Sequence, residues 1–230
     1  MTQPTSLLMP IPGAFLPPAS PQLDISADEQ NLIAMLAAKL TVLSTDMRIS
    51  QLYYDGLQRL TNLGISVPPS LAGIRTVVDW PRICVDPLVE RAEIDGFWIP
   101  GENALMTELD EIFGANDMQA EFPLAVQDSL TLGRGYMIVG APDYGEDSPI
   151  VTVESPFNLS CNWDPRTRRV TAAYQSYEVE GVFRAVLYLP DVTVSMSRDQ
   201  FSAWTVDDRD EHNFGEVPVV RMPNRSRTAD

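Results

Sequence analysis

The spacing of apolar residues changes near residue 135, and this change constrains the fold more than any other feature of the sequence. Before it, apolar residues such as Leu36, Leu40 and Leu43 recur three or four positions apart, which is the period of a helix with one buried face. From Tyr136 onward, short segments rich in Val, Thr and Tyr are separated by Gly, Pro, Asp or Asn, as in an antiparallel sheet. The sequence therefore predicts an α+β fold, with N-terminal helices followed by an antiparallel β-meander.

Local signals place the ends of several predicted elements. Ser26 and Glu29 have the spacing of a capping box at the start of a helix, which we expect to loosen at Ser44–Asp46 and to end near Gly56. Glu180-Gly181 predicts the turn of a β-hairpin. Asn103 and Asp117 are candidate N-caps and Gly133 a candidate C-terminal glycine. The further predicted helices cover residues 71–78, 82–94, 104–113 and 118–132.

Six of the nineteen prolines lie within the first 21 residues. Two interpretations of residues 1–22 remain open: a disordered tail, or an extended arm that packs on a neighbouring subunit. The arm interpretation rests on apolar side chains that a disordered tail seldom carries, namely Leu7, Leu8, Ile11, Phe15 and Leu16. The predicted domain organisation is an arm over 1–22, a helical region over 23–135, an antiparallel β region over 136–222 and a lead-in to a further element over 223–230.

The charge balance limits the class of partner. With 32 acidic and 16 basic residues, the formal net charge is −16, which argues against tight binding of nucleic acid because phosphate neutralisation needs a basic face. The longest apolar stretch, 32–43, is interrupted by Lys39 and is too short to cross a bilayer. The N-terminus lacks the pattern of a signal peptide. We expect intracellular synthesis, no membrane contact, and two buried free thiols at Cys84 and Cys161.

The sequence contains almost no candidate catalytic residues. His212 is the single histidine and follows several carboxylates in the segment 207–212, which we interpret as a solvated turn between strands and not as a metal site. The sequence "GRGY" starting at Gly133 lacks the ending of a P-loop and predicts a helix-to-strand turn. We therefore predict no enzyme activity, no metal and no cofactor.

Two further groups of residues are predicted to make contacts. The basic cluster Arg166, Arg168 and Arg169 is expected to form salt bridges to a neighbouring subunit or within the chain. Large aromatic side chains are expected to act as core or interface anchors, namely Trp80, Phe97 and Trp98.

Three stretches together resemble the phage portal proteins of long-tailed, double-stranded DNA bacteriophages. "LYYDGLQRL" (52–60) resembles the turn after their first helix, "NWDPRTRRVTAAYQSY" (162–177) resembles a strand–turn–strand, and "HNFGEVPVVRMPNR" (212–225) resembles the strand that precedes their stem helix. "SLTLGRGYMIVG" is similar to the helix that enters their sheet. The resemblance covers about residues 30–225.

The resemblance implies the N-terminal, wing-forming part of a portal subunit, with residues 223–230 leading into a stem helix that is missing here. Such subunits form a ring, usually dodecameric, at one capsid vertex, and DNA is packaged and ejected through it without tight binding. The implied partners are the major capsid protein, a head–tail adaptor and the packaging motor ATPase (terminase). The implied location is the portal vertex of the virion, after synthesis in the host cytoplasm. Two alternatives remain: a stand-alone α+β capsid-associated or tail adaptor module, and a hydrolase that uses the 207–212 cluster.

Overall fold

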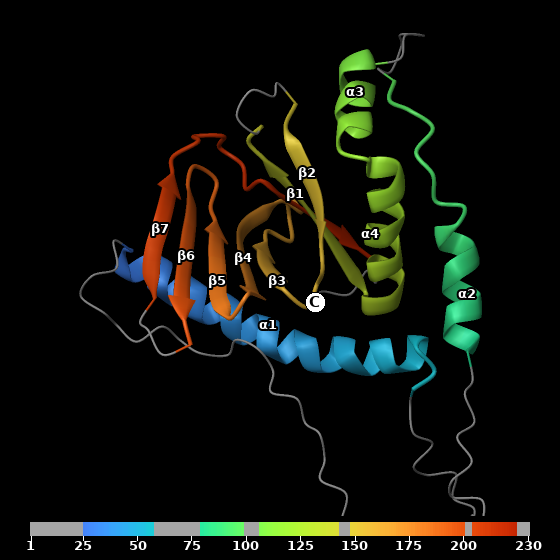
Figure 1. The fold of residues 1–230 in the computed structure, drawn as a ribbon, viewed down its shortest axis with the longest axis horizontal. Coiled ribbons are helices and arrows are strands. Elements are labelled where there is room, and N and C mark those ends of the chain that lie inside the picture. Colours follow the sequence, from blue (N-terminus) through green and yellow to red (C-terminus); the bar gives the residue numbers. More distant parts are fainter. Residues whose placement is uncertain (1–24, 58–78, 99–105, 143–147, 201–203, 225–230) are drawn as a thin grey trace, which may run out of the picture. The chain divides into compact units, whose positions relative to one another are not determined.

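The computed structural model describes the chain except for residues 1–24, 58–78, 99–105, 143–147, 201–203 and 225–230 (Figure 1). The arm, the helix predicted over 71–78 and the candidate cap Asn103 lie outside the described residues. The α+β prediction is confirmed, because helices precede antiparallel strands. The helices are α1 (Ala27–Tyr54), α2 (Trp80–Val89), α3 (Thr107–Ala115) and α4 (Met118–Leu132). The strands are β1 (Arg134–Gly140), β2 (Ile150–Glu154), β3 (Leu159–Trp163), β4 (Val170–Val179), β5 (Val182–Tyr188), β6 (Thr193–Asp199), β7 (Thr205–Asp210) and β8 (Val219–Pro223).

The chain packs as two compact units, and each is assembled from separate stretches of sequence. The five-stranded unit takes residues 1–43 and 158–217, and the three-stranded unit takes residues 44–157 and 218–230. Each unit therefore combines early and late parts of the chain. The four domain segments named from the sequence stay a prediction.

Helix α1 begins and ends at the signals that the sequence contains. The capping box is confirmed: the backbone N–H of Ser26 donates to the Glu29 carboxylate at 2.8 Å, and the N–H of Glu29 donates to Ser26 Oγ at 3.2 Å. Gly56, with a φ of 63°, follows the last turn, and the N–H of Leu57 reaches back to the carbonyl of Leu52 at 2.8 Å. That i→i−5 bond with a left-handed glycine is a Schellman ending. The expected loosening at 44–46 does not occur, since the helix is continuous.

The core of the five-stranded unit lies between α1 and one face of the sheet. The strands follow the order β3-β4-β5-β6-β7, each antiparallel to the next, as a meander (Figure 1). Tyr174 of β4 lies opposite Leu187 of β5, which in turn lies opposite Val194 of β6, and Leu36 of α1 joins the same buried cluster. The strand period of two places these side chains on one face, where they form the core with α1.

Two polar contacts fix α1 to the edge strand β3. Lys39, the single lysine of the chain, donates from Nζ to the carbonyl of Cys161 at 3.0 Å. The fully buried Ser160 donates its hydroxyl to the carbonyl of Leu36 at 2.8 Å. Buried polar groups are costly unless they are hydrogen bonded, so these bonds select one position of the helix against the sheet.

The β4–β5 hairpin confirms the turn predicted from its dipeptide. Val179 pairs with Val182, which leaves Glu180 and Gly181 as a two-residue loop. Both residues have positive φ, 52° and 81°. Positive φ at both positions defines the type I′ turn, whose twist matches that of the flanking strands.

The three-stranded unit is built around β1, which lies between β2 and β8. The approach of α4 to β1 is close, because a Cβ placed on Gly135 would lie 2.5 Å from the carbonyl oxygen of Ala125. Asn116, which follows α3, fixes β2: its Oδ1 accepts from the N–H of Val151 at 2.7 Å and its Nδ2 donates to the carbonyl of Pro149 at 2.9 Å. Gly133 ends α4 in a left-handed conformation (φ 82°) and leads into β1, as predicted.

Several predicted helix limits were wrong. Helix α2 begins at Trp80, with Pro81 in its first turn, and it ends at Val89 before the predicted limit at residue 94. Pro87 lies inside this short helix, where it removes one backbone donor and shortens the run. Helix α3 extends from residue 107 to 115, where the prediction was 104 to 113. Asp117 precedes α4 as expected but makes no side-chain cap bond, because its own φ of 48° is left-handed.

Candidate functional site

His212 shapes a loop after β7. Its Nδ1 accepts a hydrogen bond from the backbone N–H of Phe214 at 3.3 Å, and the two rings stack with centroids 4.2 Å apart. Because Nδ1 accepts, the proton of the neutral ring lies on Nε2, which is 3.3 Å from Thr193 Oγ1. Both ring nitrogens therefore make structural contacts.

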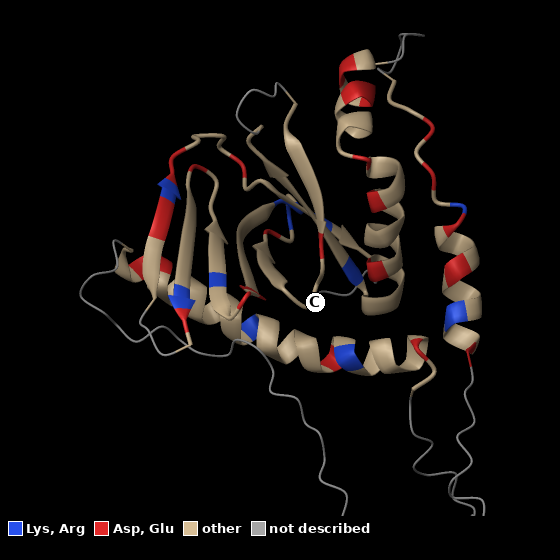
Figure 2. Cartoon of the chain, viewed as in Figure 1, with Lys and Arg blue, Asp and Glu red and all other residues tan. Residues whose placement is uncertain are grey.

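The segment 207–212 is not the turn that the sequence predicted. Residues 205–210 form β7, the edge strand of the five-stranded sheet. Its acidic residues Asp207, Asp208 and Asp210 are exposed, and Figure 2 shows the acidic stretch along this edge. Charges on an edge strand oppose pairing with another sheet. Across the part of the chain that the structure describes, no three His, Cys, Asp or Glu side chains are grouped so that they could hold a metal ion.

Arg209 of β7 joins the edge strand to α1. Its guanidinium donates to the Glu29 carboxylate at 2.9 Å. Burial would raise the pKa of Glu29, but hydrogen bonds from Arg209 and from the backbone and hydroxyl of Ser26 outweigh it, so the pKa is lowered. The same carboxylate thus caps α1 and pairs with β7.

The basic cluster lies on the turn between β3 and β4, residues 164–169, which we call the arginine turn. The Asp164 carboxylate accepts from the backbone N–H of Arg166 and from the Thr167 hydroxyl, both at 2.8 Å. These bonds lower the pKa of Asp164, the bond from the Arg166 backbone most of all. Arg168 has a φ of 61°. Arg169 forms an ion pair with Glu216 of the same chain.

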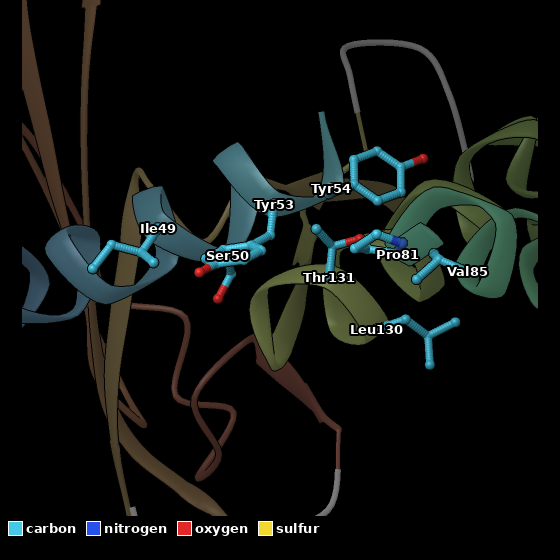
Figure 3. A pocket seen from close by; sticks show the side chains of 8 residues that line it. All are labelled: Ile49, Ser50, Tyr53, Tyr54, Pro81, Val85, Leu130 and Thr131. Carbon is cyan, nitrogen blue, oxygen red and sulfur yellow. The ribbon is translucent and has the colours of Figure 1, made fainter. Parts of the chain in front are cut away.

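The three-stranded unit contains a pocket of about 370 Å³, which Figure 3 shows from close by. Tyr54 is held at its wall: its hydroxyl donates to the Asp86 carboxylate at 2.6 Å, and the Arg82 guanidinium lies 5.0 Å from the centre of its ring. Eight side chains from α1, α2 and α4 line the pocket: Ile49, Ser50, Tyr53, Tyr54, Pro81, Val85, Leu130 and Thr131.

Helix α2 and the segment after it carry large apolar side chains that the described residues leave exposed. Trp80 is 70% exposed and Trp98, after the helix, is 56% exposed, so neither is a core residue among the described residues, and their role as interface anchors stays a prediction. Phe97 does pack, edge to face, on Phe113 at a centroid distance of 5.9 Å. Cys84 is also exposed, against the prediction, whereas Cys161 is buried as expected. The apolar neighbours of Cys84, Ile83 and Val85, suggested that this thiol is buried. In the structure no residue of α2 is buried.

Asp128 on α4 is a partly buried acid with a clearly shifted pKa. Burial raises its pKa from 3.8 to about 6. The sequence analysis missed this residue, because a carboxylate within an amphipathic helix carries no sign of burial. The pocket was missed for a related reason, since its walls come from helices that are distant in sequence.

The remaining predicted site residues are not tested by the described structure. The apolar residues of the arm lie outside the described residues. Arg166 and Arg168 are exposed on the arginine turn, and their role in subunit contact stays a prediction. No helix that the structure describes has both the length and the hydropathy needed to span a bilayer.

The described residues thus form an α+β chain with a histidine-anchored loop and a charged sheet edge. Comparison with known proteins gives the family. Residues 49–229 match the model of the family described as "Phage portal protein, SPP1 Gp6-like", and the chain belongs to this family of phage portal proteins.

Two curated relatives are both described as "Portal protein". The chain is 32% identical over 196 residues to the portal protein of Mycobacterium phage L5, with 81% of this chain and 40% of the relative covered. It is 31% identical over 194 residues to the portal protein of Mycobacterium phage D29, with 80% and 40% covered. The match therefore spans less than half the length of these relatives.

Proposed function

We propose that this chain is the wing-forming part of a portal subunit that assembles into a ring, usually of twelve copies, at the unique capsid vertex. Double-stranded DNA would enter and leave through the ring without tight binding. Membership of the portal family carries this proposal, and the description "Portal protein" of both relatives supports it.

The charge of the chain supports a conduit role. A net charge of −16 repels phosphate, so DNA that moves past this surface would not adhere to it. The arginine turn is the main basic feature, and one of its three guanidinium groups is already paired with Glu216. A portal needs no chemistry of its own, since a separate ATPase motor drives the DNA.

The proposed partners are other copies of this chain, the major capsid protein, a head–tail adaptor and the packaging motor ATPase (terminase). Within this chain we propose that the arm and the arginine turn make subunit or capsid contacts. The uncovered aromatic side chains Trp80 and Trp98 are consistent with burial in an assembly, because large exposed apolar side chains are typical of interfaces.

Antibody labelling of the virion tests the proposal. Antibodies against the arginine turn should bind one vertex per particle in electron micrographs of opened capsids. Heads assembled without the protein should contain no packaged DNA. Label along the tail, or at every vertex, would contradict the portal assignment, and label confined to the tail would favour the adaptor alternative.

A further inference from the structure

Helix α2 has apolar side chains on two opposite faces. Pro81 and Val85, four residues apart, line the pocket of the three-stranded unit (Figure 3). Trp80 and Ile83 lie on the side away from the pocket, at about 100° of rotation per residue, and are 70% and 64% exposed. A helix that is apolar on opposite faces is normally buried on both. The face that carries Trp80 and Ile83 therefore has the character of a contact surface.

The pocket has the size and the lining of a site for one large apolar side chain. Its volume of about 370 Å³ is near the lower end of the usual range for ligand sites, about 300–1,000 Å³. Ile49, Val85 and Leu130 make its wall apolar. Tyr54 is held in place at that wall by its bond to Asp86. All the lining residues belong to the three-stranded unit, so the pocket is formed within one compact unit.

A hydroxyl group at the pocket wall lacks a partner. Thr131 lines the pocket, and its Oγ1 is buried with no hydrogen-bond partner among the described residues. Buried hydroxyl groups are normally satisfied, and a hydroxyl oxygen can accept from an N–H donor. Tryptophan is the large apolar side chain that carries such a donor, and Trp80 is the most exposed large apolar side chain that the structure describes.

The charges beside the two surfaces are opposite in sign. The exposed Asp79 precedes Trp80, and the exposed Arg48 precedes Ile49 of the pocket. A carboxylate next to an inserted indole can therefore pair with a guanidinium beside the pocket, which favours one orientation of approach. Such a pair matters in a chain with a net charge of −16, because two copies repel each other in most other orientations.

One chain cannot fill its own pocket with its own Trp80. Trp80 and Pro81 are adjacent on α2, yet Trp80 is exposed while Pro81 lines the pocket. The indole must come from a second copy. Because the inserted face and the pocket are different surfaces, the contact is heterologous, so that each copy gives one indole and accepts one. Heterologous contacts close into a ring when the rotation between neighbours allows it.

We propose that Trp80 of one copy of this chain inserts into the pocket of the next copy. The indole ring packs against Ile49 and Leu130 of the next copy, and its N–H donates to Thr131 Oγ1 there. Asp79 lies beside Arg48 of the next copy. The contact deepens the ring proposal, because it names two surfaces through which neighbours meet, and it rests on that proposal for the presence of a neighbour.

Cys84 provides a probe on the inserted face. It lies one turn after Trp80 and is exposed, whereas Cys161 is buried. A thiol-directed benzophenone attached to Cys84 of the full 230-residue chain is irradiated. Covalent dimers are quantified on denaturing gels, and the cross-linked peptides are identified by mass spectrometry. The expected dimer joins the α2 peptide of one copy to an α1 or α4 peptide that contains Ile49 or Leu130.

Matched variants test the inserted side chain. Trp80→Ala should lower the yield of covalent dimer at least about tenfold, as expected for a tryptophan at the centre of an interface. Val220→Ala replaces a half-exposed side chain of β8, a strand that contributes nothing to the pocket, and should leave the yield within about twofold. Thermal unfolding followed by circular dichroism checks that each variant is folded.

The pocket side has its own variants. Ile49→Asp should lower the yield like Trp80→Ala, because a carboxylate is costly in an apolar contact, whereas Val42→Asp, an exposed position two turns earlier on α1, should not. Thr131→Val removes the hydroxyl that lacks a partner, so the chain should be no less stable in urea. The same variant should lower the dimer yield about two- to tenfold, and an unchanged yield would refute the bond to Thr131.

Mixing two defective variants tests whether the contact is heterologous. Labelled Ile49→Asp keeps its Trp80, and Trp80→Ala with Cys84→Ser keeps its pocket but carries no exposed thiol. Neither should form covalent dimers alone, whereas an equal mixture should restore the yield to within about threefold of the wild-type chain, since one intact contact remains.

Several results would overturn the proposal: no covalent dimer with the wild-type chain, a mixture no better than its components, or cross-links mainly between two α2 peptides. The outcome is distinguishable from that of vertex labelling. A labelled vertex without restored dimers would refute this contact alone, and restored dimers without a labelled vertex would refute the portal location and leave the contact standing.

Discussion

Asp128 lies on α4, where burial raises its pKa from 3.8 to about 6. A carboxylate with a raised pKa in the folded state contributes stability that is fully present below its unfolded pKa, near 4, and is lost as the pH rises through about 6. At pH 8 the folded protein therefore holds an ionised group that would be better solvated in the unfolded chain. Replacing it by asparagine removes the charge and keeps the shape.

The magnitude follows from the two pKa values. A difference between 3.8 and about 6 corresponds to about 3 kcal/mol at a pH above both. Asp128 is partly exposed, so water screens part of this energy and we expect Asp128→Asn to raise the free energy of unfolding by about 1–2 kcal/mol at pH 8. The gain should shrink through pH 6 and be absent near pH 4.

Urea unfolding of both proteins between pH 4 and pH 8 measures the effect as a difference at each pH, so that the titration of other groups, such as Glu29, cancels. Asp110→Asn is the control, because this aspartate of α3 is exposed and its replacement should change stability by less than about 0.5 kcal/mol. A gain that is equal at pH 4 and pH 8 would refute the ionisation argument and indicate a packing effect. No gain at pH 8 would show that the carboxylate is hydrated.

Three further predictions concern packing and charge. Gly135→Ala should cost about 1–3 kcal/mol by urea unfolding, because its Cβ would meet the carbonyl of α4. Gly140→Ala in the same strand, where the nearest atom is 3.8 Å from the Cβ, should cost less than about 0.5 kcal/mol, and equal costs would contradict the close approach. Trp204→Ala should cost about 3–5 kcal/mol, since Trp204 is 7% exposed, whereas the exposed Trp98 should tolerate alanine in the isolated chain, as melting curves will show. Replacing the three arginines of the arginine turn by alanine should leave duplex DNA binding near zero in fluorescence anisotropy at physiological salt; a salt-dependent affinity that this variant loses would favour a nucleic-acid-binding module.

The parts of the fold that could be predicted are those decided by residues near one another in sequence. The capping box of Ser26 and Glu29 depends on a separation of three residues. The Glu180-Gly181 turn needs positive φ at adjacent positions, and Gly133 ends α4 for the same steric reason. The period of apolar residues likewise separated the helices from the meander.

The errors come from positions where neighbours in sequence do not decide the environment. Residues 207–210 have the acidic composition that is typical of a solvated loop. They nevertheless form part of an edge strand, because β6 supplies backbone hydrogen-bond partners along one side of it. Cys84 has apolar neighbours and Trp80 is a large aromatic residue, yet both are exposed, since none of the described elements covers that side of α2. The pocket and the burial of Asp128 both depend on how the helices pack against one another. The spacing of apolar residues within one helix does not reveal that packing.

The division of the five-stranded unit between residues 1–43 and 158–217 has a consequence for biosynthesis. The helix segment that fills its core leaves the ribosome about 115 residues before the first strand it packs on. At about 5–20 residues per second, that gap lasts roughly 6–23 seconds. During this interval the apolar side chains of Ile33 and Leu36, which are buried in the finished unit, have no sheet to cover them. Nascent chains of this protein should therefore be good clients for a chaperone that binds near the ribosomal exit, and release from it should follow completion of the meander.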